Sequence, residues 1–370
     1  MDPVRHERGI KSHTEKFRFC LLTWYDAHAR ELPWRESRDP YRIWLSEIML
    51  QQTRVAAVIE HYHEFLGRFP SVEKLAAARE ASVLAAWSGL GYYRRARMLR
   101  AAAKVIVQEL GGQFPTTSEG WHALPGIGRY TAAAISSIAF GEAVAVVDGN
   151  VERVLQRVSG QHLTGEKLWR AAEELLDRKR PGDFNQAMME LGATVCTPRA
   201  PACLTCPVVK LCVTRGEMPG SAKAARQKKR EVHYALSYRS HAKDGDAEVF
   251  LVQRPRAASL MAGMWELPEI DTQVPRDGKK RVPPPRLRSG LRPSGSGKTA
   301  RNDKSGEDLR PLLVLRHSIT VTDYTVQVWC QPAPPAVRGE WISSTRLGRI
   351  PLTGLARKIL RKAGLLRGKA

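Results

Sequence analysis

The sequence predicts two domains of different fold class: a mainly helical domain at residues 1–212 and a smaller α+β domain at residues 232–370. Apolar residues recur at helical spacing through residue 195. From residue 232 onward, short runs rich in β-branched and aromatic residues replace them. The polar, basic stretch between the two, residues 213–231, is typical of a solvated linker. A chain of 370 residues is long enough to build two separate cores.

The formal net charge of +22 points to a polyanionic partner, and nucleic acid is the natural one. Lys and Arg displace counterions from phosphates, which gives binding without regard to base sequence. We see no apolar run long enough to span a bilayer, so an acidic membrane surface is the weaker reading. Residues 1–16 lack the apolar core of a signal peptide, and we expect a cytoplasmic protein.

Residues 17–30 suit an amphipathic helix, and the next helix, residues 43–50, is apolar on almost every side. A helix of that kind is buried, yet it contains one carboxyl group, Glu47. Burial disfavours the charged form, so the pKa of Glu47 should rise and let it hold a proton near neutral pH. The alternative is a glutamate that reaches solvent or pairs with Arg35.

Two further segments have the residue types needed to open a DNA duplex. Gln52 follows the Glu47 helix, and an amide side chain can fill the space left by an extruded base. Tyr92 and Tyr93 precede several arginines, and an aromatic ring in such a place can wedge between bases while the arginines hold phosphates. For these two tyrosines the alternative is packing in the core.

The stretch 124–131 contains Gly126 and Gly128, which allow a tight backbone turn before a helix whose first amides can face an anion. That is the shape of a phosphate-gripping hairpin, although an ordinary loop is the alternative for so short a motif. One helix later the chain returns with Asp148, which places a carboxylate near the gripped backbone. An acid beside bound DNA suggests chemistry on a nucleotide.

Four of the six cysteines lie between residues 196 and 212, in the spacing Cys-x6-Cys-x2-Cys-x5-Cys, at positions Cys196, Cys203, Cys206 and Cys212. Four thiolates can bind zinc or wrap an iron–sulfur cluster, and the spacing alone leaves the metal open. The isolated Cys20 and Cys330 are expected to be small buried thiols.

The hairpin followed by Asp148-Gly149-Asn150 resembles the helix-hairpin-helix DNA glycosylase superfamily that includes endonuclease III, and within it the MutY-type adenine DNA glycosylases. The segments 50–53 and 89–93 and the cysteine spacing fit the same pattern. The resemblance implies a helix-hairpin-helix domain with a 4Fe-4S loop, held by the four clustered cysteines and facing phosphate with basic side chains. It also implies a Nudix-like fold for the second domain.

The resemblance also implies roles for individual residues. Glu47 would protonate the leaving base, Asp148 would stabilise an oxocarbenium-like sugar, and Asn150 would orient Asp148. Gln52 and Tyr92 would disrupt the base pair. The other residues expected to contact DNA from this domain are Arg35, Leu50, Gly126 and Gly128.

The implied activity is base excision repair by a monofunctional glycosylase, which flips out and removes adenine opposite 8-oxoguanine or guanine in double-stranded DNA. The resemblance further implies a monomer that works in the nucleoid. An endonuclease III-type lyase is the main alternative, but it needs a lysine just after the hairpin, where this chain has Tyr130. A DNA-binding protein without catalysis is the other alternative, and the presence of both Glu47 and Asp148 argues against it.

The second domain departs from its implied family in two places. Residues 276–301 are rich in Arg, Lys and Pro, with Asp277 as the single acid, so they cannot form a Nudix magnesium site; we expect a disordered basic insert at 275–308 and binding without hydrolysis. In the loop expected to read 8-oxoguanine, His317 is present and Thr320 replaces a serine, but Val321 replaces a second histidine. We therefore expect a narrower preference for 8-oxoguanine over guanine.

Overall fold

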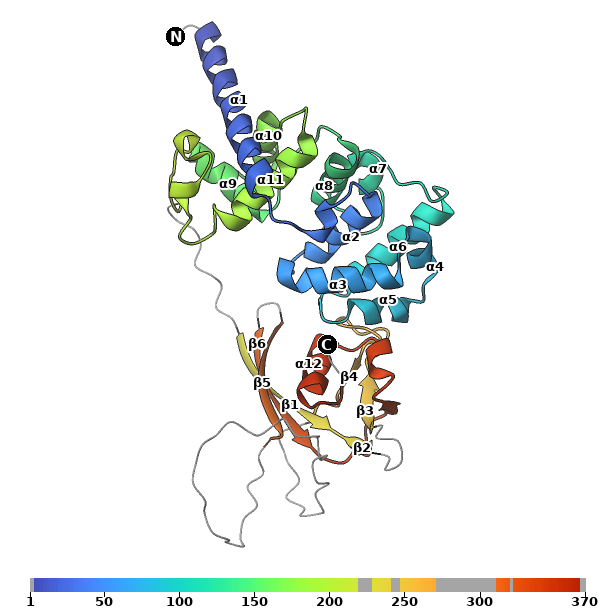
Figure 1. Ribbon diagram of the computed structural model, residues 1–370. Coiled ribbons are helices and arrows are strands. Elements are labelled where there is room, and N and C mark those ends of the chain that lie inside the picture. The colour runs from blue at the N-terminus through green and yellow to red at the C-terminus, as the bar shows by residue number, and fades with distance from the viewer. Residues whose placement is uncertain (1–2, 219–227, 241–246, 271–310, 320–321, 367–370) are drawn as a thin grey trace, which may run out of the picture. The chain divides into compact units, whose positions relative to one another are not determined.

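The computed structural model describes residues 3–218, 228–240, 247–270, 311–319 and 322–366 (Figure 1). The chain divides into two compact units: unit 1 comprises Met1–Ala78 and Arg94–Lys223, and unit 2 comprises Arg79–Tyr93 and Ala224–Ala370. Sequence reasoning assigned Arg79–Tyr93 to the first domain, whereas its contacts place it in unit 2.

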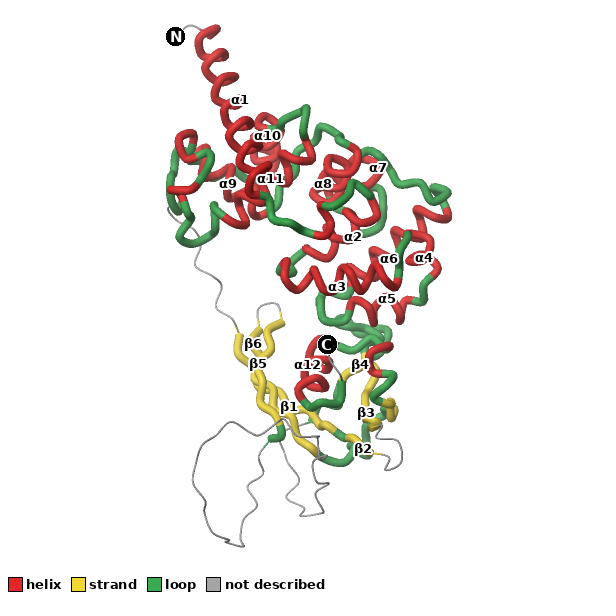
Figure 2. The backbone as a smooth tube through the Cα atoms, in the orientation of Figure 1, coloured by secondary structure: helices red, strands yellow, loops and turns green. Residues whose placement is uncertain are grey.

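Unit 1 is helical, as predicted, and Figure 2 shows it without strands in its described residues. Its helices are α1 (Pro3–His28), α2 (Pro40–Leu50), α3 (Val55–Arg68), α4 (Val72–Ala77), α6 (Arg94–Gln108), α7 (Ser118–His122), α8 (Arg129–Phe140), α9 (Gly149–Ser159), α10 (Gly165–Leu175) and α11 (Pro181–Thr194), with short 3-10 turns η1 (Pro33–Arg35), η2 (Cys203–Thr205) and η3 (Val209–Leu211).

Helix α2 has clear start and stop signals. Pro40 occupies its first turn, and the side chain of Asp39 accepts hydrogen bonds from the backbone N–H groups of Tyr41 and Arg42. The helix ends at Leu50, so Gln51–Thr53 forms a turn instead of a further stretch of helix. Within α2, every residue from Tyr41 to Met49 except Arg42 is buried. The predicted all-round burial of this helix is confirmed.

One core of unit 1 lies among α1, α8, α9 and α11. It joins buried apolar residues from the start and the end of the helical domain, among them Phe17, Ala134, Leu155 and Leu191. Contacts of α11 with α1, α8 and α9 hold these helices together. This packing holds α8 and α9 together in one compact unit.

The described residues of unit 2 form one sheet of three strands and one of four, as the α+β prediction requires. Its elements are α5 (Glu80–Trp87), β1 (Lys228–Leu236), β2 (Tyr238–Ser240), β3 (Ala247–Gln253), β4 (Trp265–Glu266), β5 (Leu313–Ile319), β6 (Thr322–Cys330), β7 (Glu340–Ser343), η4 (Leu347–Arg349) and α12 (Gly354–Lys362).

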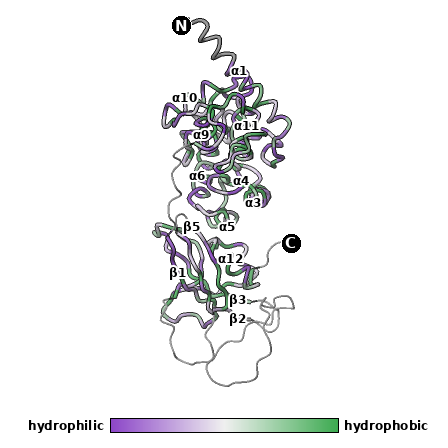
Figure 3. Tube along the Cα trace, turned by 90° about the vertical axis from the view of Figure 1, so that its left-hand side faces the viewer, coloured by the Kyte–Doolittle hydropathy of each residue, from purple (hydrophilic) through white to green (hydrophobic). Residues whose placement is uncertain are grey.

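The first sheet has the order β1-β6-β5, in which β1 runs parallel to β6 and β5 antiparallel to it. The second has the order β2-β3-β4, with β7 paired to β3. Helix α12 adds Ala356, Ile359 and Leu360 to a core shared with both sheets. Each unit thus has its own hydrophobic residues, which Figure 3 colours green along both parts of the chain.

Some predicted features fall outside the described residues: the basic insert at 275–308, and part of the linker, residues 219–227. Among the helices that are described, none has the length and apolar character needed to cross a membrane.

Candidate active site

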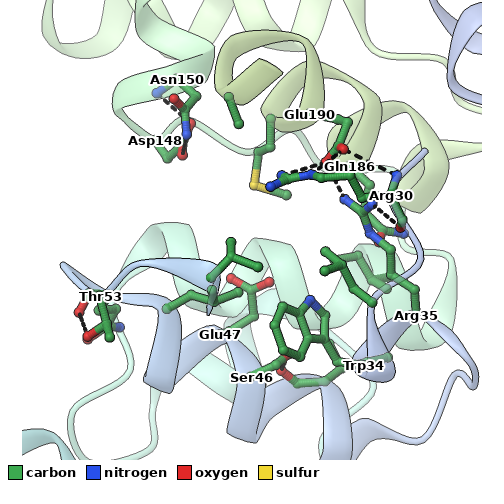
Figure 4. Close-up of a pocket in the computed structure, with 18 of the residues that line it drawn as sticks. Arg30, Trp34, Arg35, Ser46, Glu47, Thr53, Asp148, Asn150, Gln186 and Glu190 are labelled. Atoms are coloured by element: carbon green, nitrogen blue, oxygen red, sulfur yellow. Dashed lines mark hydrogen bonds and ion pairs between the residues drawn. The ribbon is translucent and has the colours of Figure 1, made fainter. Parts of the chain in front are cut away.

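A cavity of about 550 Å³ in unit 1 brings together segments that are far apart in the sequence. Its lining includes Glu47, Tyr130, Asp148 and Asn150, together with Leu50, Gln52 and Arg35. Figure 4 shows the Glu47 carboxyl group pointing from α2 into the cavity, with Asp148 and Asn150 on the opposite side and an arginine cluster at one edge. Seven of the residues singled out from the sequence therefore share one site.

Glu47 is only 6% exposed, as its apolar helix predicts. Burial raises its pKa from 4.5 to about 7, the negative charge of Asp148 acts in the same direction, and a hydrogen bond from Tyr130 and the charge of Arg35 oppose the rise. A carboxyl group with this pKa is protonated in an appreciable fraction of molecules at neutral pH. The site therefore holds a proton donor.

Tyr130, in the first turn of α8, donates a hydrogen bond from its hydroxyl group to Glu47 Oε2 at 2.8 Å. The Tyr130 hydroxyl oxygen also lies 3.2 Å from the sulfur of Met189. Burial raises the pKa of Tyr130 well above its ordinary value, so the phenol stays neutral. It fixes the orientation of the Glu47 carboxyl group and remains a donor over the physiological pH range.

Asp148 is the N-cap residue of α9. Its Oδ1 accepts hydrogen bonds from the backbone N–H groups of Asn150 (2.9 Å) and Val151 (2.7 Å), and its Oδ2 accepts one from Asn150 Nδ2 (2.9 Å). Donors at a helix N-terminus stabilise a negative charge. The structure thus contains the contact through which Asn150 was expected to orient Asp148. The same Asp148 carboxylate also caps α9.

Arg153, which sequence reasoning missed, supports Asn150 from behind. Its Nη2 donates to Asn150 Oδ1 and to the carbonyl oxygen of Gly192, both at 2.7 Å, and its Nε donates to the carbonyl oxygen of Cys196 at 2.7 Å. A single arginine therefore joins the Asp148 turn to the first cysteine of the loop. In the sequence it looks like an ordinary charged residue of an amphipathic helix, and no local signal distinguishes it.

The structure corrects the alternative in which Arg35 pairs with Glu47. The ion-pair partner of Arg35 is Glu190, at 2.9 Å, and Arg30 binds the other carboxylate oxygen of Glu190 at 2.6 Å. Arg35 also donates to Gln186 Oε1 at 3.2 Å, and it lines the cavity, where we expected it to face DNA. Its engaged guanidinium helps to form the wall of the cavity.

Glu190, also missed, has the same sequence signature as Glu47. It is the single carboxyl group between Phe184 and Thr194, the mostly buried part of α11, and it is 1% exposed; Asp183 lies in the first turn of the same helix. The rule that found Glu47 could have found Glu190 as well. The sequence could not tell which of the two has arginine partners.

The residues expected to open the duplex have unusual backbones. Gln52 is exposed at the rim of the cavity with φ 54°, and Tyr92 is 45% exposed in unit 2 with φ 46°. Both angles lie in the left-handed region, which costs energy for a residue other than glycine and is typical of functional turns. Tyr93 is 5% exposed. Core packing thus describes Tyr93 but not Tyr92.

The hairpin before α8 has the backbone that its glycines predicted. Gly126 has φ +76°, and a Cβ there would lie 2.4 Å from Met98 Cβ, so only glycine fits. Gly128 is the N-cap of α8 and provides no side-chain cap. The first amides of α8 are therefore not satisfied by a capping side chain, which suits an anion such as a phosphate.

The four clustered cysteines line one hollow in unit 1, beside Arg157, whose Nη1 donates to Cys196 Sγ at 3.3 Å. No group of three or more His, Cys, Asp or Glu side chains in the described part of the chain could hold a single metal ion as it stands. For the two isolated cysteines, the expectation of burial is wrong for Cys330, which is exposed, and Cys20 is only partly buried.

In unit 2, His317 lies on β5 opposite Tyr324 of β6. Partial burial lowers its pKa, and the nearby charge of Lys358 acts in the same direction, so the imidazole is neutral at physiological pH. Thr320 and Val321, the other residues of the expected recognition loop, lie outside the described residues.

Comparison with known proteins agrees with this fold. Residues 45–178 match the HhH-GPD superfamily of base excision DNA repair proteins. A solved thermostable thymine-DNA glycosylase is similar to 55% of this chain and 97% of its own, with a TM-score of 0.53 and 32% sequence identity. The helical unit is therefore of the class found in base excision repair glycosylases.

The relatives are more specific. The adenine DNA glycosylase of Buchnera aphidicola (strain Sg) is 33% identical over 70% of this chain and 76% of its own length, and that of Schizosaccharomyces pombe is 32% identical over 73% and 74%. The chain belongs to the adenine DNA glycosylase family. The human adenine DNA glycosylase is 42% identical over 69% of this chain, which spans 57% of the human protein's length.

Proposed function

We propose that this protein removes adenine from double-stranded DNA in which adenine is mispaired with 8-oxoguanine or guanine, without cleaving the strand. The observation that carries the proposal is the pairing of a buried, proton-holding Glu47 with an N-capping Asp148 across one cavity. Two carboxyl groups whose environments differ in this way can act as acid and anion in the same reaction. Membership of the adenine DNA glycosylase family supports adenine as the base.

In the proposed reaction the adenine nucleotide is first flipped into the cavity. Glu47 donates its proton to a ring nitrogen of adenine, the C1′–N9 bond breaks, and its electron pair leaves with the base. The sugar becomes an oxocarbenium-like cation that the Asp148 carboxylate stabilises. Addition of water to C1′, with loss of one proton, completes the hydrolysis and leaves an abasic site.

The proposed DNA contacts come from the cavity rim and the hairpin of unit 1 and from Tyr92 of unit 2. Flipping costs a few kcal/mol of stacking and pairing, which Gln52 would offset by entering the emptied position. Leu50 lines the cavity beside it. The uncapped amides after Gly128 would hold a phosphate of the same strand, and Tyr92 would wedge between the bases.

The lyase alternative lacks its nucleophile. A Schiff base with the sugar requires an amine, and the described residues that line the cavity include no lysine. Tyr130 stands at the position just after the hairpin and is held against Glu47 as a neutral phenol. These observations support a monofunctional glycosylase.

We further propose that Cys196, Cys203, Cys206 and Cys212 hold a 4Fe-4S cluster. The four thiols line one hollow, and their spacing resembles that of the 4Fe-4S loop of MutY-type glycosylases, which supports a cluster over zinc. Such a cluster supplies iron–thiolate bonds that fold the loop. The loop's own Arg199, Lys210 and Arg215 would then face phosphate.

For unit 2 we propose recognition of the base opposite adenine. His317 is neutral and can donate or accept a hydrogen bond, and Thr320 would supply a hydroxyl group. With Val321 in place of a histidine, the preference for 8-oxoguanine over guanine should be narrow, since one polar contact is worth about 1–3 kcal/mol of discrimination.

The test is a strand-break assay on duplexes that carry adenine opposite 8-oxoguanine, guanine, cytosine or thymine, with excess protein. Breaks that appear only after alkali, and only at the two purine mispairs, are the expected result. Breaks without alkali would establish a lyase instead. No breaks with any duplex, combined with intact DNA binding, would establish a binding protein.

A further inference from the structure

The loop that carries Tyr92 is held by side chains from the C-terminal end of the protein. Within unit 2, Ser88 Oγ donates a hydrogen bond to the carbonyl oxygen of Leu352 at 2.6 Å and accepts one from Arg357 Nε at 2.9 Å. Arg357 also reaches the carbonyl oxygen of Ala85 at 3.4 Å, and Tyr93 donates to the Leu352 oxygen at 3.3 Å. We define Ser88, Tyr93, Leu352 and Arg357 as the clasp.

Three of the four clasp residues are buried and Arg357 is half-buried, so the hydrogen bonds of Ser88 and Tyr93 to the Leu352 oxygen are shielded from water. Ser88 is 1% exposed, Tyr93 5% and Leu352 0%. Burial raises the pKa of Tyr93, which keeps its phenol a donor. Leaving a buried donor or acceptor unsatisfied costs more than a surface hydrogen bond is worth. The clasp therefore restricts both ends of the short loop 88–93.

The loop itself has a backbone that needs such restraint. Gly89, Gly91 and Tyr92 all have positive φ. Glycine adopts such angles without strain, whereas φ 46° is strained for Tyr92, which has a side chain. The buried indole of Trp87 adds a hydrogen bond to the Gly91 carbonyl oxygen at 3.1 Å. A strained conformation of this kind persists only when its surroundings hold it in place.

The clasp also connects to the strand that carries His317. Leu352 forms a bridge with Trp265 of β4, which anchors it on the second sheet. On α12, the residue next to Arg357 is Lys358, whose Nζ donates to the carbonyl oxygen of Arg316 at 2.7 Å, directly before His317 on β5. Two adjacent residues of α12 thus contact two different segments. Arg357 contacts the loop 88–93, which carries Tyr92, and Lys358 contacts β5, which carries His317.

We propose that Arg357 and Ser88 are positioning residues that set the conformation of Tyr92 and link it, through α12, to base recognition by β5. This inference rests on the proposed function, because it takes Tyr92 as the residue that wedges between bases and His317 as part of the site that recognises the base opposite adenine. It adds that α12 controls the conformation of Tyr92.

The experiment places 2-aminopurine beside the mispair and measures its fluorescence on binding, which reports unstacking without any need for excision. The variants are Arg357→Met, Arg357→Lys, Ser88→Ala and Tyr92→Ala, and the matched control is Arg361→Met, an exposed arginine one turn later on α12. Single-turnover excision and the affinity for a fully matched duplex are measured alongside.

Arg357→Met and Ser88→Ala should reduce the unstacking signal and lower the excision rate on the order of tenfold, the effect of one partly buried hydrogen bond that involves a charged donor. Affinity for the matched duplex should not change. Arg357→Lys should recover part of the signal, and Arg361→Met should behave as the wild type.

Different failures have different meanings. If Arg357→Met and Ser88→Ala both match Arg361→Met, the positioning role is refuted while the proposed function stands. If Tyr92→Ala unstacks DNA as the wild type does, Tyr92 is not the wedge, and the positioning role fails together with that part of the proposed function; adenine excision is judged separately by the single-turnover assay. Should Arg357→Met not fold, Ser88→Ala, which removes a single hydroxyl group, decides the question.

Discussion

Burying the Glu47 carboxyl group has two consequences: the group can act as a proton donor near neutral pH, and its ionised form destabilises the folded protein. Replacing Glu47 with glutamine tests both. Glutamine has nearly the same shape and can still accept the hydrogen bond from Tyr130, but it has no acidic proton. We expect Glu47→Gln to lose adenine excision and to retain DNA binding. We also expect it to be more stable than the wild type at high pH.

The size of the stability effect follows from the pKa of Glu47, which burial raises from 4.5 to about 7. Because the folded pKa exceeds the unfolded one, the unfolded chain loses its proton first as the pH rises. Stability therefore falls between about pH 4.5 and pH 7. One pKa unit corresponds to about 1.4 kcal/mol, so above pH 7 the ionised Glu47 costs about 3 kcal/mol that glutamine avoids.

Urea unfolding of both proteins at pH 5 and pH 8 measures this cost. The gain for Glu47→Gln should be about 1 kcal/mol or less at pH 5 and should grow to about 3 kcal/mol at pH 8. Glu60→Gln, which changes an exposed glutamate of α3, is the control and should show no such growth. An equal effect of Glu47→Gln at the two pH values would show that burial does not hold the proton on Glu47. Excision by Glu47→Gln at the wild-type rate would refute its role as the acid.

Three further predictions concern the neighbours of Glu47 and the cysteine loop. Tyr130→Phe removes a hydrogen bond that lowers the pKa of Glu47, so the high-pH decline of the single-turnover excision rate should move up by about one pH unit; a move to lower pH would contradict this geometry. Arg153→Met leaves Asn150 without its support, and we expect roughly tenfold slower excision with an unchanged pH midpoint; a shifted midpoint would mean that Arg153 acts on Glu47 instead. Cys206→Ser should lower the iron content and the visible absorbance of the purified protein and weaken DNA binding, whereas Cys20→Ser should change neither; full iron content in Cys206→Ser would exclude it as a ligand.

The parts of the site that could be predicted from the sequence are those with local causes. An apolar helix with one carboxyl group must bury it, which located Glu47. Glycines before a helix shape a turn, which located Gly126 and Gly128. Asp148 was located by its place one helix after that turn, and the structure adds that it caps the next helix. In each case a few neighbouring residues determine the geometry.

The parts that could not be predicted depend on contacts between distant segments. Arg153 has the same local pattern as any exposed arginine of an amphipathic helix. It can hold Asn150 in place because the fold brings the carbonyl oxygens of Gly192 and Cys196 within hydrogen-bond distance of its guanidinium. Likewise, the membership of Arg79–Tyr93 in unit 2 depends on Leu352 and Arg357, more than 250 residues later. No local pattern contains that information.

Glu47 and Glu190 show how such contacts decide chemical roles. Both are buried carboxyl groups on mostly buried helices that line one cavity. Burial acts to raise the pKa of Glu190 as well, but hydrogen bonds and charges from Arg30 and Arg35 outweigh it, and the pKa lies below its ordinary value. Among the residues that the structure describes, no arginine forms an ion pair with Glu47, and its pKa rises to about 7. Because Glu190 engages both arginines, it also keeps Arg35 from neutralising Glu47. The ionised glutamate thus maintains the protonated one, and the acid of the proposed reaction depends on a residue that never needs to touch the substrate.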